Sequence, residues 1–266
     1  MPETVLSNSD LEKIVDTSDD WITTRTGIKE RRILDKGIGT SYMAIKAANS
    51  IIEKKQINPL DIDLVIVATI TPDMHATATA AFVASEIGAS NAFGYDINAA
   101  CSGFLYGMST ASTFIESGRY KKVLLIGADK MSSIVDYQDR NTCIIFGDGA
   151  GAVLLEPNTN GLGVQDEYLR SDGSNRDLLR IEAGGSINPT TNETVMSKKH
   201  FIYQDGKNVF KHAVSNMSNA ADQIMIRNGL TKSDVSFLVA HQANKRIIDA
   251  TSNRMGIEDD KVLMNI

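Results

Sequence analysis

Apolar and polar residues alternate in blocks along the first half of the chain. Residues 63–70 form a continuous run rich in β-branched side chains, which is typical of a strand buried on both faces of a sheet. Residues 41–55 instead place alanines and aliphatic side chains at helical spacing, which predicts an amphipathic helix. Further strands are predicted at 92–98 and 122–128, and further helices at 76–88 and 102–117. This alternation favours a parallel sheet covered by helices.

The pattern changes in the second half of the chain. A glycine-rich segment at 147–151 is flanked by apolar runs that predict strands at 142–146 and 152–156. Residues 158–200 are polar and rich in Gly and Asn, which indicates irregular structure with a strand or two. The remaining predicted elements are short helical pieces within 9–25, a helix at 208–227, a buried strand at 235–240 and a helix at 243–255.

Two distant parts of this pattern resemble each other. Residues 92–117 and 235–255 both run from a predicted strand through a reactive polar residue into a predicted helix. A duplicated α/β architecture produces such an echo. We therefore predict an α/β protein with two halves, an N-terminal one over 1–157 and a C-terminal one over 158–266.

Composition narrows the classes of function. The formal net charge of −6 argues against a molecule whose whole surface coats nucleic acid or an anionic membrane, although a local basic patch remains compatible with it. No apolar run approaches the roughly 20 residues that span a bilayer, and the first residues lack the basic and apolar parts of a secretory signal. Two cysteines are too few for a disulfide scaffold. We expect a cytoplasmic protein.

Cys101 is the first candidate for chemistry, because it lies where a predicted strand gives way to a predicted helix. The positive end of the helix dipole is expected to lower the pKa of a thiol there and to favour the nucleophilic thiolate. Small neighbours from Ala99 to Gly103 would let a substrate carbonyl approach the backbone, where the N–H of Cys101 could stabilise an oxyanion. Cysteine is also a common buried apolar residue, and spacing alone favours that packing role.

His241 ends a predicted strand and precedes a predicted helix, so it is the histidine best placed to meet Cys101 at one sheet edge. The alternative is a hydrogen-bonded structural histidine, which is the more frequent case. The other histidines, His75, His200 and His212, have no neighbours at zinc-ligand spacing, and we expect no metal site.

Two further motifs have a structural and a functional interpretation. The segment 147–151 lacks the Gly-Lys-Ser/Thr ending of a phosphate loop and precedes an apolar strand, so a turn or close backbone packing is favoured over nucleotide binding. Trp21 and Arg25 are four residues apart and could stack on a nucleotide-like group. A tryptophan packed under an arginine stem is the simpler interpretation.

Taken together, these segments resemble β-ketoacyl-acyl-carrier-protein synthase III, one of the thiolase-like condensing enzymes. The resemblance covers nearly the whole chain, with the motifs in the order and at the spacing of the family. The matching motifs are DTSDDWI (16–22), TRTGI (24–28), NAACSGF (98–104), IFGDGAGA (145–152), GKNVFK (206–211) and HQANKRI (241–247). The glycine motif alone is weak, but the ordered set is specific. It implies a thiolase-like fold of duplicated α/β halves with mixed sheets and a buried central helix layer.

The resemblance also implies a reaction in two steps that starts fatty-acid synthesis. Cys101 would take the acyl group of an acyl-CoA, and malonyl-acyl-carrier protein would then lose CO₂ and attack the acyl-cysteine. His241 would hydrogen-bond the malonyl thioester oxygen as negative charge develops on it. No cofactor is implied beyond these substrates, and the family is typically homodimeric.

The resemblance assigns binding roles to further residues. Trp21 and Arg140 match positions that sandwich the CoA adenine, and Arg25 matches one near the CoA phosphates. Gly206, Asn208 and Asn244 match the pantetheine tunnel, and Phe210 matches a position that shapes the active site. Lys211, Arg246 and Arg254 resemble a basic patch that docks acyl carrier protein. Thr77 stands where well-known members carry a phenylalanine that caps the primer pocket of the partner subunit, so we expect a longer or wider acyl pocket here.

The ends of the chain depart from the family pattern. The first strand expected before Pro2 is missing, and the chain stops at Ile266, shortly before a Gly-Asn-Thr-Ser-like motif that carries a catalytic asparagine. Asn265 does not match that asparagine, because it lies in the strand that leads to the motif. We therefore expect a chain truncated at both ends, with an incomplete C-terminal half and a weak decarboxylation step.

Two other functions fit the same residues. A related thiolase-like acyltransferase would transfer acyl groups without releasing CO₂ from malonyl-carrier protein. A pseudoenzyme would use the fold only to bind carrier protein or its own kind, and would retain no acyl group on Cys101. Because Cys101 and His241 are both present, the pseudoenzyme is the least favoured of the three.

Overall fold

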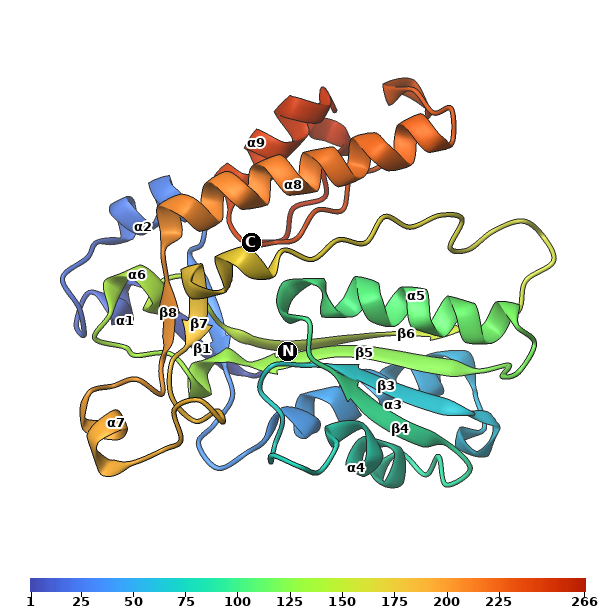
Figure 1. Cartoon of the computed structure of the whole chain (residues 1–266), viewed down its shortest axis with the longest axis horizontal. Coiled ribbons are helices and arrows are strands. Elements are labelled where there is room, and N and C mark those ends of the chain that lie inside the picture. Colours follow the sequence, from blue (N-terminus) through green and yellow to red (C-terminus); the bar gives the residue numbers. More distant parts are fainter. The chain divides into compact units, whose positions relative to one another are not determined.

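The computed structural model describes residues 1–266, which group into two compact units (Figure 1). The first unit consists of Met1–Thr4, Arg32–Ser133 and Gly147–Glu167. The second unit consists of Val5–Arg31, Ile134–Phe146 and Tyr168–Ile266. Because each unit is assembled from separate stretches, the predicted boundary at residue 157 between two contiguous halves stays a prediction.

The first unit is built on a four-stranded sheet in the order β4-β3-β5-β6. Its strands are β3 (Leu64–Ala68), β4 (Phe93–Ile97), β5 (Val123–Lys130) and β6 (Asp148–Leu155). The central strand β3 pairs in parallel with both β4 and β5, with Ala68 opposite Ile97 and Gly127. All five residues of β3 are buried, which confirms the prediction from its run of β-branched side chains.

Helices cover both faces of this sheet (Figure 1). The helices α3 (Thr40–Lys55) and α4 (Thr79–Glu86) pack on one face and α5 (Gly103–Glu116) on the other. Along β3, Val65 and Val67 belong to the first layer, whereas Leu64 and Ile66 belong to the second. The alternation follows from the two-residue period of a strand.

The glycine-rich motif has a different structure from the predicted one. The predicted strand at 142–146 is wrong, because residues Arg140–Cys143 form the short helix α6, which the Asp139 side chain caps by accepting the N–H of Asn141 at 3.0 Å. The motif itself opens strand β6, which is antiparallel to β5. The Asp148 carboxylate is buried and accepts the backbone N–H of Ser132 at 2.8 Å and of Leu34 at 2.7 Å. The motif is therefore structural.

The second unit contains the remaining helices, one short sheet and most of the residues of another. The strands β1 (Thr4–Ser7) and β2 (Glu30–Ile33) pair with each other, and β7 (Leu179–Ile181) pairs antiparallel with β8 (Ile202–Gln204). The helices are α1 (Asn8–Leu11), α2 (Asp19–Thr26), α6, α7 (Asn192–Met196), α8 (Gly206–Arg227) and α9 (Lys245–Met255). Helices α8 and α9 lie side by side (Figure 1).

Two structural features favour glycine at the C-terminal end of helix α2. Gly27 adopts a φ of 80°, the left-handed conformation that favours glycine at a helix C-terminus. A Cβ atom on Gly27 would also lie 2.8 Å from the Cβ of Lys245 at the start of α9. The Thr-Gly pair of the matched motif thus allows α2 and α9 to pack closely.

The predicted buried strand at 235–240 does not form. Only Leu238 makes an isolated parallel bridge, to Val262, and Phe237 and Val239 are exposed. The N–H of Leu238 donates to the carbonyl oxygen of Lys261 at 2.8 Å, but no longer ladder of hydrogen bonds continues from it. An apolar run becomes a strand only where neighbouring strands supply such a ladder.

None of the helices is both long enough and apolar enough to cross a lipid bilayer.

Candidate active site

Cys101 lies at the strand-to-helix junction that the sequence predicts. It sits in a short 3₁₀ turn, Ala100–Ser102, between β4 and α5, and it is exposed. The preceding residue Ala100 has a φ of 46°, which is unfavourable for a residue with a side chain. Strain of this kind concentrates at functional sites, where the surrounding structure holds it in place.

The start of α5 is held close to the sheet and left open to ligands. A Cβ atom on Gly103 would lie 3.2 Å from the Cβ of Ala68, so glycine lets the helix start approach β3. Ser102, at the N-cap position, makes no capping hydrogen bond with its side chain. The first N–H groups of α5 therefore lack a side-chain acceptor and could bind developing negative charge next to Cys101.

The thiol of Cys101 does not have the lowered pKa that the helix position predicts. Protein atoms around the side chain exclude water although the residue keeps exposed surface, and this desolvation raises the pKa of the thiol. The negative charge of Asp129 raises the pKa further, and a backbone hydrogen bond opposes it. The correction follows from a carboxylate that the local sequence around Cys101 does not reveal.

Asp129 is a residue of this site that the sequence interpretation missed. It lies at the end of β5, and its carboxylate accepts hydrogen bonds from the backbone N–H of Ile70 at 2.8 Å and from the hydroxyls of Thr69 and Thr71 at 2.9 Å. These bonds join the ends of β3 and β5. The signal in the sequence is an acidic residue directly after a buried apolar strand, because such a position points to a sheet edge.

His241 lies in the second unit, between the bridge at Leu238 and helix α9. Desolvation lowers the pKa of its imidazole below the ordinary value of 6.5, so the ring is neutral at pH 7. A neutral imidazole still carries one N–H donor. Cys101 belongs to the other unit, and the predicted meeting of the two side chains stays a prediction.

Gln242 fixes the loop that carries His241, a role that the sequence interpretation missed. Its amide nitrogen donates to the carbonyl oxygens of Ala240 and Leu263, each at 3.0 Å, and its amide oxygen accepts the N–H of Asn265 at 3.0 Å. The side chain thereby joins the residues on either side of His241 to the end of the chain. An amide next to a candidate histidine was the only available signal in the sequence.

Trp21, Arg25 and Arg140 come together in the second unit. The guanidinium carbon of each arginine lies 4.7 Å from the centroid of the Trp21 ring. The predicted role of the three residues in binding CoA stays a prediction. Arg140 also donates to the carbonyl oxygen of Asp16 at 3.0 Å. Because Arg140 stacks directly on the indole, a base could enter between them only if the guanidinium moved away.

The residues predicted to line the pantetheine tunnel lie at the starts of α8 and α9. Gly206 begins α8 and would have open space around a Cβ atom. The side-chain amide of Asn208 donates to Asp205 at 2.8 Å, and the side-chain oxygen of Asn244 caps α9 by accepting the N–H of Ile247 at 3.0 Å. Both asparagines thus have a structural role, and their predicted place in the pantetheine tunnel stays a prediction.

The residues predicted to dock carrier protein lie on the same two helices. Arg246 stacks over the ring of Phe210, with 5.6 Å between guanidinium carbon and ring centroid. Arg254 donates to the hydroxyl of Ser215 at 3.3 Å, and Lys211 is exposed on α8. Thr77, predicted to shape an acyl pocket, is exposed in the first unit just before α4.

Comparisons with known proteins identify the family. The sequence model of the 3-oxoacyl-[acyl-carrier-protein] synthase III family matches residues 95–173, and the sequence model of the family's C-terminal part matches residues 225–266. The chain is 57% identical over 269 residues to β-ketoacyl-[acyl-carrier-protein] synthase III of Chlorobaculum tepidum, covering 100% of this chain and 82% of that protein. It is 53% identical to β-ketoacyl-[acyl-carrier-protein] synthase III 2 of Bacteroides thetaiotaomicron, covering 100% and 80% respectively.

The fold agrees with this result. The crystal structure of 3-oxoacyl-[acyl-carrier-protein] synthase III from Aquifex aeolicus VF5 superposes with a TM-score of 0.90 at 41% identity, covering 100% of this chain and 81% of that chain. The predicted α/β fold of the thiolase-like condensing enzymes is therefore confirmed, whereas the expected truncation is not confirmed. The chain belongs to the β-ketoacyl-acyl-carrier-protein synthase III family.

Proposed function

We propose that Cys101 and His241 carry the two steps of the synthase III reaction in this chain. In the first step the sulfur of Cys101 attacks the thioester carbonyl of an acyl-CoA, the bond to the CoA sulfur breaks, and the thiol proton passes to the departing CoA. In the second step malonyl-acyl-carrier protein loses CO₂, and its carbanion attacks the acyl-cysteine. The new carbon–carbon bond gives a β-ketoacyl-carrier protein, the bond from the acyl carbon to the Cys101 sulfur breaks, and the released thiolate takes a proton from water to return to the thiol.

The observation that carries this proposal is the position of Cys101 at an uncapped helix start. An exposed cysteine at a helix start that no side chain caps suits a nucleophile whose target carbonyl becomes an oxyanion. The raised pKa of the thiol means that most of it is protonated at neutral pH. Deprotonation is therefore part of the first step, which fits a reaction in which the leaving CoA takes the proton.

The proposed partners follow from other residues. The stack of Trp21 with Arg140 supports binding of the CoA nucleotide, and the cations on α8 and α9 support docking of an acidic carrier protein. We expect no cofactor and a cytoplasmic location, in line with two free cysteines. A homodimer is supported by the unpaired edge of β4, near which Phe93 and Phe82 are exposed.

The test is to supply the purified chain with an acyl-CoA and malonyl-acyl-carrier protein and to measure three products. We expect free CoA, CO₂ and β-ketoacyl-carrier protein in equal amounts, together with an acyl group on Cys101 when the malonyl substrate is withheld. Free CoA without CO₂ would instead identify an acyltransferase that does not decarboxylate. No acyl-enzyme at all would identify a carrier-protein binder.

We expect the primer pocket to accept chains longer or wider than acetyl, because Thr77 replaces a bulkier phenylalanine at the position that caps it. A series of acetyl-, isobutyryl- and hexanoyl-CoA should show kcat/KM for the larger primers at least about equal to that for acetyl-CoA. Thr77→Phe should lower kcat/KM for the larger primers by roughly 10-fold while sparing acetyl-CoA. Strict acetyl preference in the unchanged chain would overturn this expectation.

A further inference from the structure

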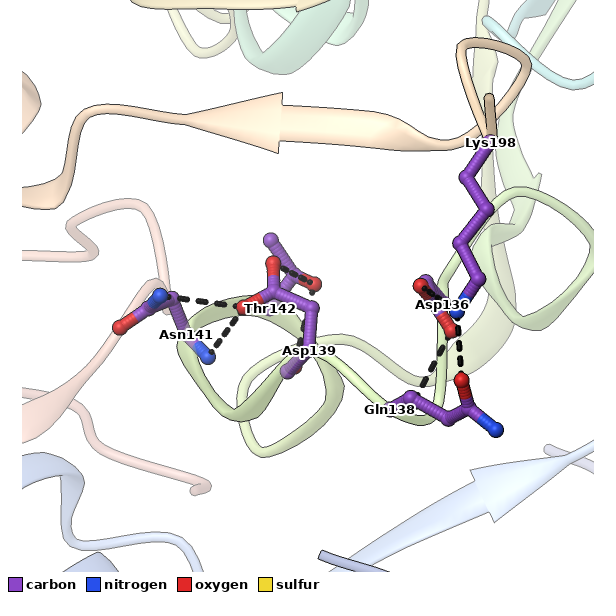
Figure 2. Close-up of polar contacts among 6 residues, drawn as sticks. All are labelled: Asp136, Gln138, Asp139, Asn141, Thr142 and Lys198. Atoms are coloured by element: carbon purple, nitrogen blue, oxygen red, sulfur yellow. Dashed lines mark hydrogen bonds and ion pairs between the residues drawn. The ribbon is translucent and has the colours of Figure 1, made fainter. Parts of the chain in front are cut away.

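The segment that carries Arg140 is held by a lysine from a distant part of the second unit. Figure 2 shows Lys198 reaching from the loop after α7 to the turn before α6. Its ammonium group lies 2.8 Å from the carboxylate of Asp136 and 2.6 Å from the side-chain oxygen of Gln138. One cation thus binds two positions of the turn, four and two residues before Arg140.

The rest of the turn is ordered by its own side chains (Figure 2). The other oxygen of Asp136 accepts the N–H of Gln138 at 3.0 Å, and the backbone oxygen of Asp136 accepts the N–H of Asp139 at 2.9 Å. Asp139 then caps α6, also accepting the hydroxyl of Thr142 at 2.9 Å. A continuous set of hydrogen bonds therefore runs from Lys198 to the first turn of the helix that begins at Arg140.

Asp136 is the more buried partner of the ion pair with Lys198, and it is negatively charged. Its side chain is 17% exposed, whereas that of Lys198 is 47% exposed. Burial on its own would raise the pKa of the Asp136 carboxyl, but the hydrogen bonds from Lys198 and Gln138 and the charges of Lys198 and His200 outweigh burial and lower it. The carboxylate is therefore ionised at neutral pH and needs a cation beside it.

Lys198 also occupies an unusual backbone position. Its φ of 57° lies in the left-handed region, where a residue with a side chain is disfavoured. The chain leaves α7 through this residue, and four residues later the N–H of Ile202 donates to the carbonyl oxygen of Ile134 at 2.8 Å. The loop after α7 is thereby attached to the Arg140 segment through backbone as well as side chain.

From this geometry we infer that Lys198 is a positioning residue for the nucleotide part of acyl-CoA. It fixes the turn at Asp136 and Gln138, and the turn fixes α6. Helix α6 then holds the backbone of Arg140 beside the ring of Trp21, so that only the guanidinium has to move when the base enters. Lys198 itself is not expected to touch the substrate. The inference rests on the proposed function, because it takes the Trp21 stack as the place where the CoA nucleotide binds.

Lys198→Met tests the inference, with Lys199→Met as its matched control. Lys199 is the next residue, and its replacement by Met removes the same charge. Its ammonium group lies 2.7 Å from the carboxylate of Glu182, and this ion pair does not involve the Arg140 segment. In Lys198→Met we expect KM for acyl-CoA to rise roughly 5-fold with little change in kcat, since a partly exposed charged pair is lost. KM for the acyl-pantetheine thioester, which lacks the nucleotide, should stay unchanged, and Lys199→Met should resemble the unchanged chain.

A second measurement monitors the stacking of Arg140 on Trp21 in the absence of substrate. Trp21 is the only tryptophan and is half-buried, so its fluorescence reports on the two guanidinium groups stacked on it, those of Arg25 and Arg140. Lys198→Met should make the indole easier to quench with acrylamide, Lys198→Arg should restore protection, and Asp136→Asn should reproduce the Lys198→Met result. A parallel rise in KM for both thioesters, or equal quenching of Lys198→Met and Lys199→Met, would overturn the positioning role.

Two further variants separate failure of this inference from failure of the proposed function. Trp21→Ala and Arg140→Ala should each raise KM for acyl-CoA selectively over acyl-pantetheine. If both do so and Lys198→Met does not, the positioning role alone is wrong. If neither does so, the CoA nucleotide binds elsewhere, and both the proposed binding site and the role of Lys198 fall.

Discussion

Cys101→Ala is expected to remove the acyl-enzyme and to lower condensation by on the order of 10⁴-fold or more, because a covalent route cannot proceed without its nucleophile. Intact-protein mass spectrometry after incubation with acyl-CoA measures the acyl group directly. The same variant should still release CO₂ from malonyl-acyl-carrier protein, since that step is assigned to His241. Loss of both activities together would show that Cys101→Ala damages the fold rather than the chemistry.

The matched control is Cys143→Ala. Cys143 is fully buried in α6, and burial raises the pKa of its thiol to about 11, so it is protected from both substrate and alkylating agents. Cys143→Ala should keep the acyl-enzyme at a modest cost in stability, about 1 kcal/mol. Acylation that followed Cys143 instead of Cys101 would contradict the assignment.

The pH dependence of alkylation gives an independent reading of the Cys101 site. The thiolate is the reactive form, and both desolvation and Asp129 raise the pKa of this thiol. The rate with iodoacetamide should therefore rise by about tenfold per pH unit through neutral pH and continue to rise above the ordinary thiol pKa of 9.0. In Asp129→Asn the whole profile should shift to lower pH, because a negative charge is lost.

The sequence predicts the first unit well, because local pattern and burial agree there. Leu64–Ala68 is entirely buried and entirely apolar, so a periodic reading suffices to assign β3. The helix at 41–55 is found at Thr40–Lys55, and the one at 102–117 at Gly103–Glu116. The position of Cys101 follows from two such assignments, a strand and a helix, because only two residues separate Ile97 from the turn that begins at Ala100.

Where local pattern and tertiary structure disagree, the predictions fail. Residues 142–146 are apolar enough for a strand, but Asp139 caps a helix start three residues earlier and determines the structure. Residues 235–240 are apolar and β-branched, yet only Leu238 finds a partner. In both places the deciding interaction comes from outside the window that the pattern describes.

The same limit applies to the candidate site. The stack of Arg140 on Trp21, the carboxylate of Asp129 near Cys101 and the contact of Lys198 with Asp136 all join residues far apart in the chain. Composition and spacing carry no information on such pairs. The family motifs predicted the pair of Arg140 and Trp21. The Asp129 and Lys198 contacts are seen only in the structure.

His241→Ala is expected to lower CO₂ release from malonyl-acyl-carrier protein by about 10²- to 10³-fold, the usual cost of removing one donor to a developing oxyanion. Acylation of Cys101 by acyl-CoA should be retained, because the His241 imidazole is assigned no role in that step. Radiolabelled malonyl substrate measures the first activity, and mass spectrometry of the acyl-enzyme measures the second. A histidine that only supports the fold would impair both steps together.

Two further measurements distinguish a His241 imidazole that donates an N–H from one that transfers a proton. Desolvation lowers the pKa of the His241 ring below the ordinary value of 6.5, so we expect any transition in the rate of decarboxylation to have its midpoint below pH 6.5. His241→Gln keeps an N–H donor and should recover part of the lost rate, whereas His212→Ala on α8 should leave it unchanged. A rate that instead titrates at the ordinary imidazole pKa, with no recovery in His241→Gln, would mean that the ring acts by exchanging a proton, and the electrostatic role assigned to it would be wrong.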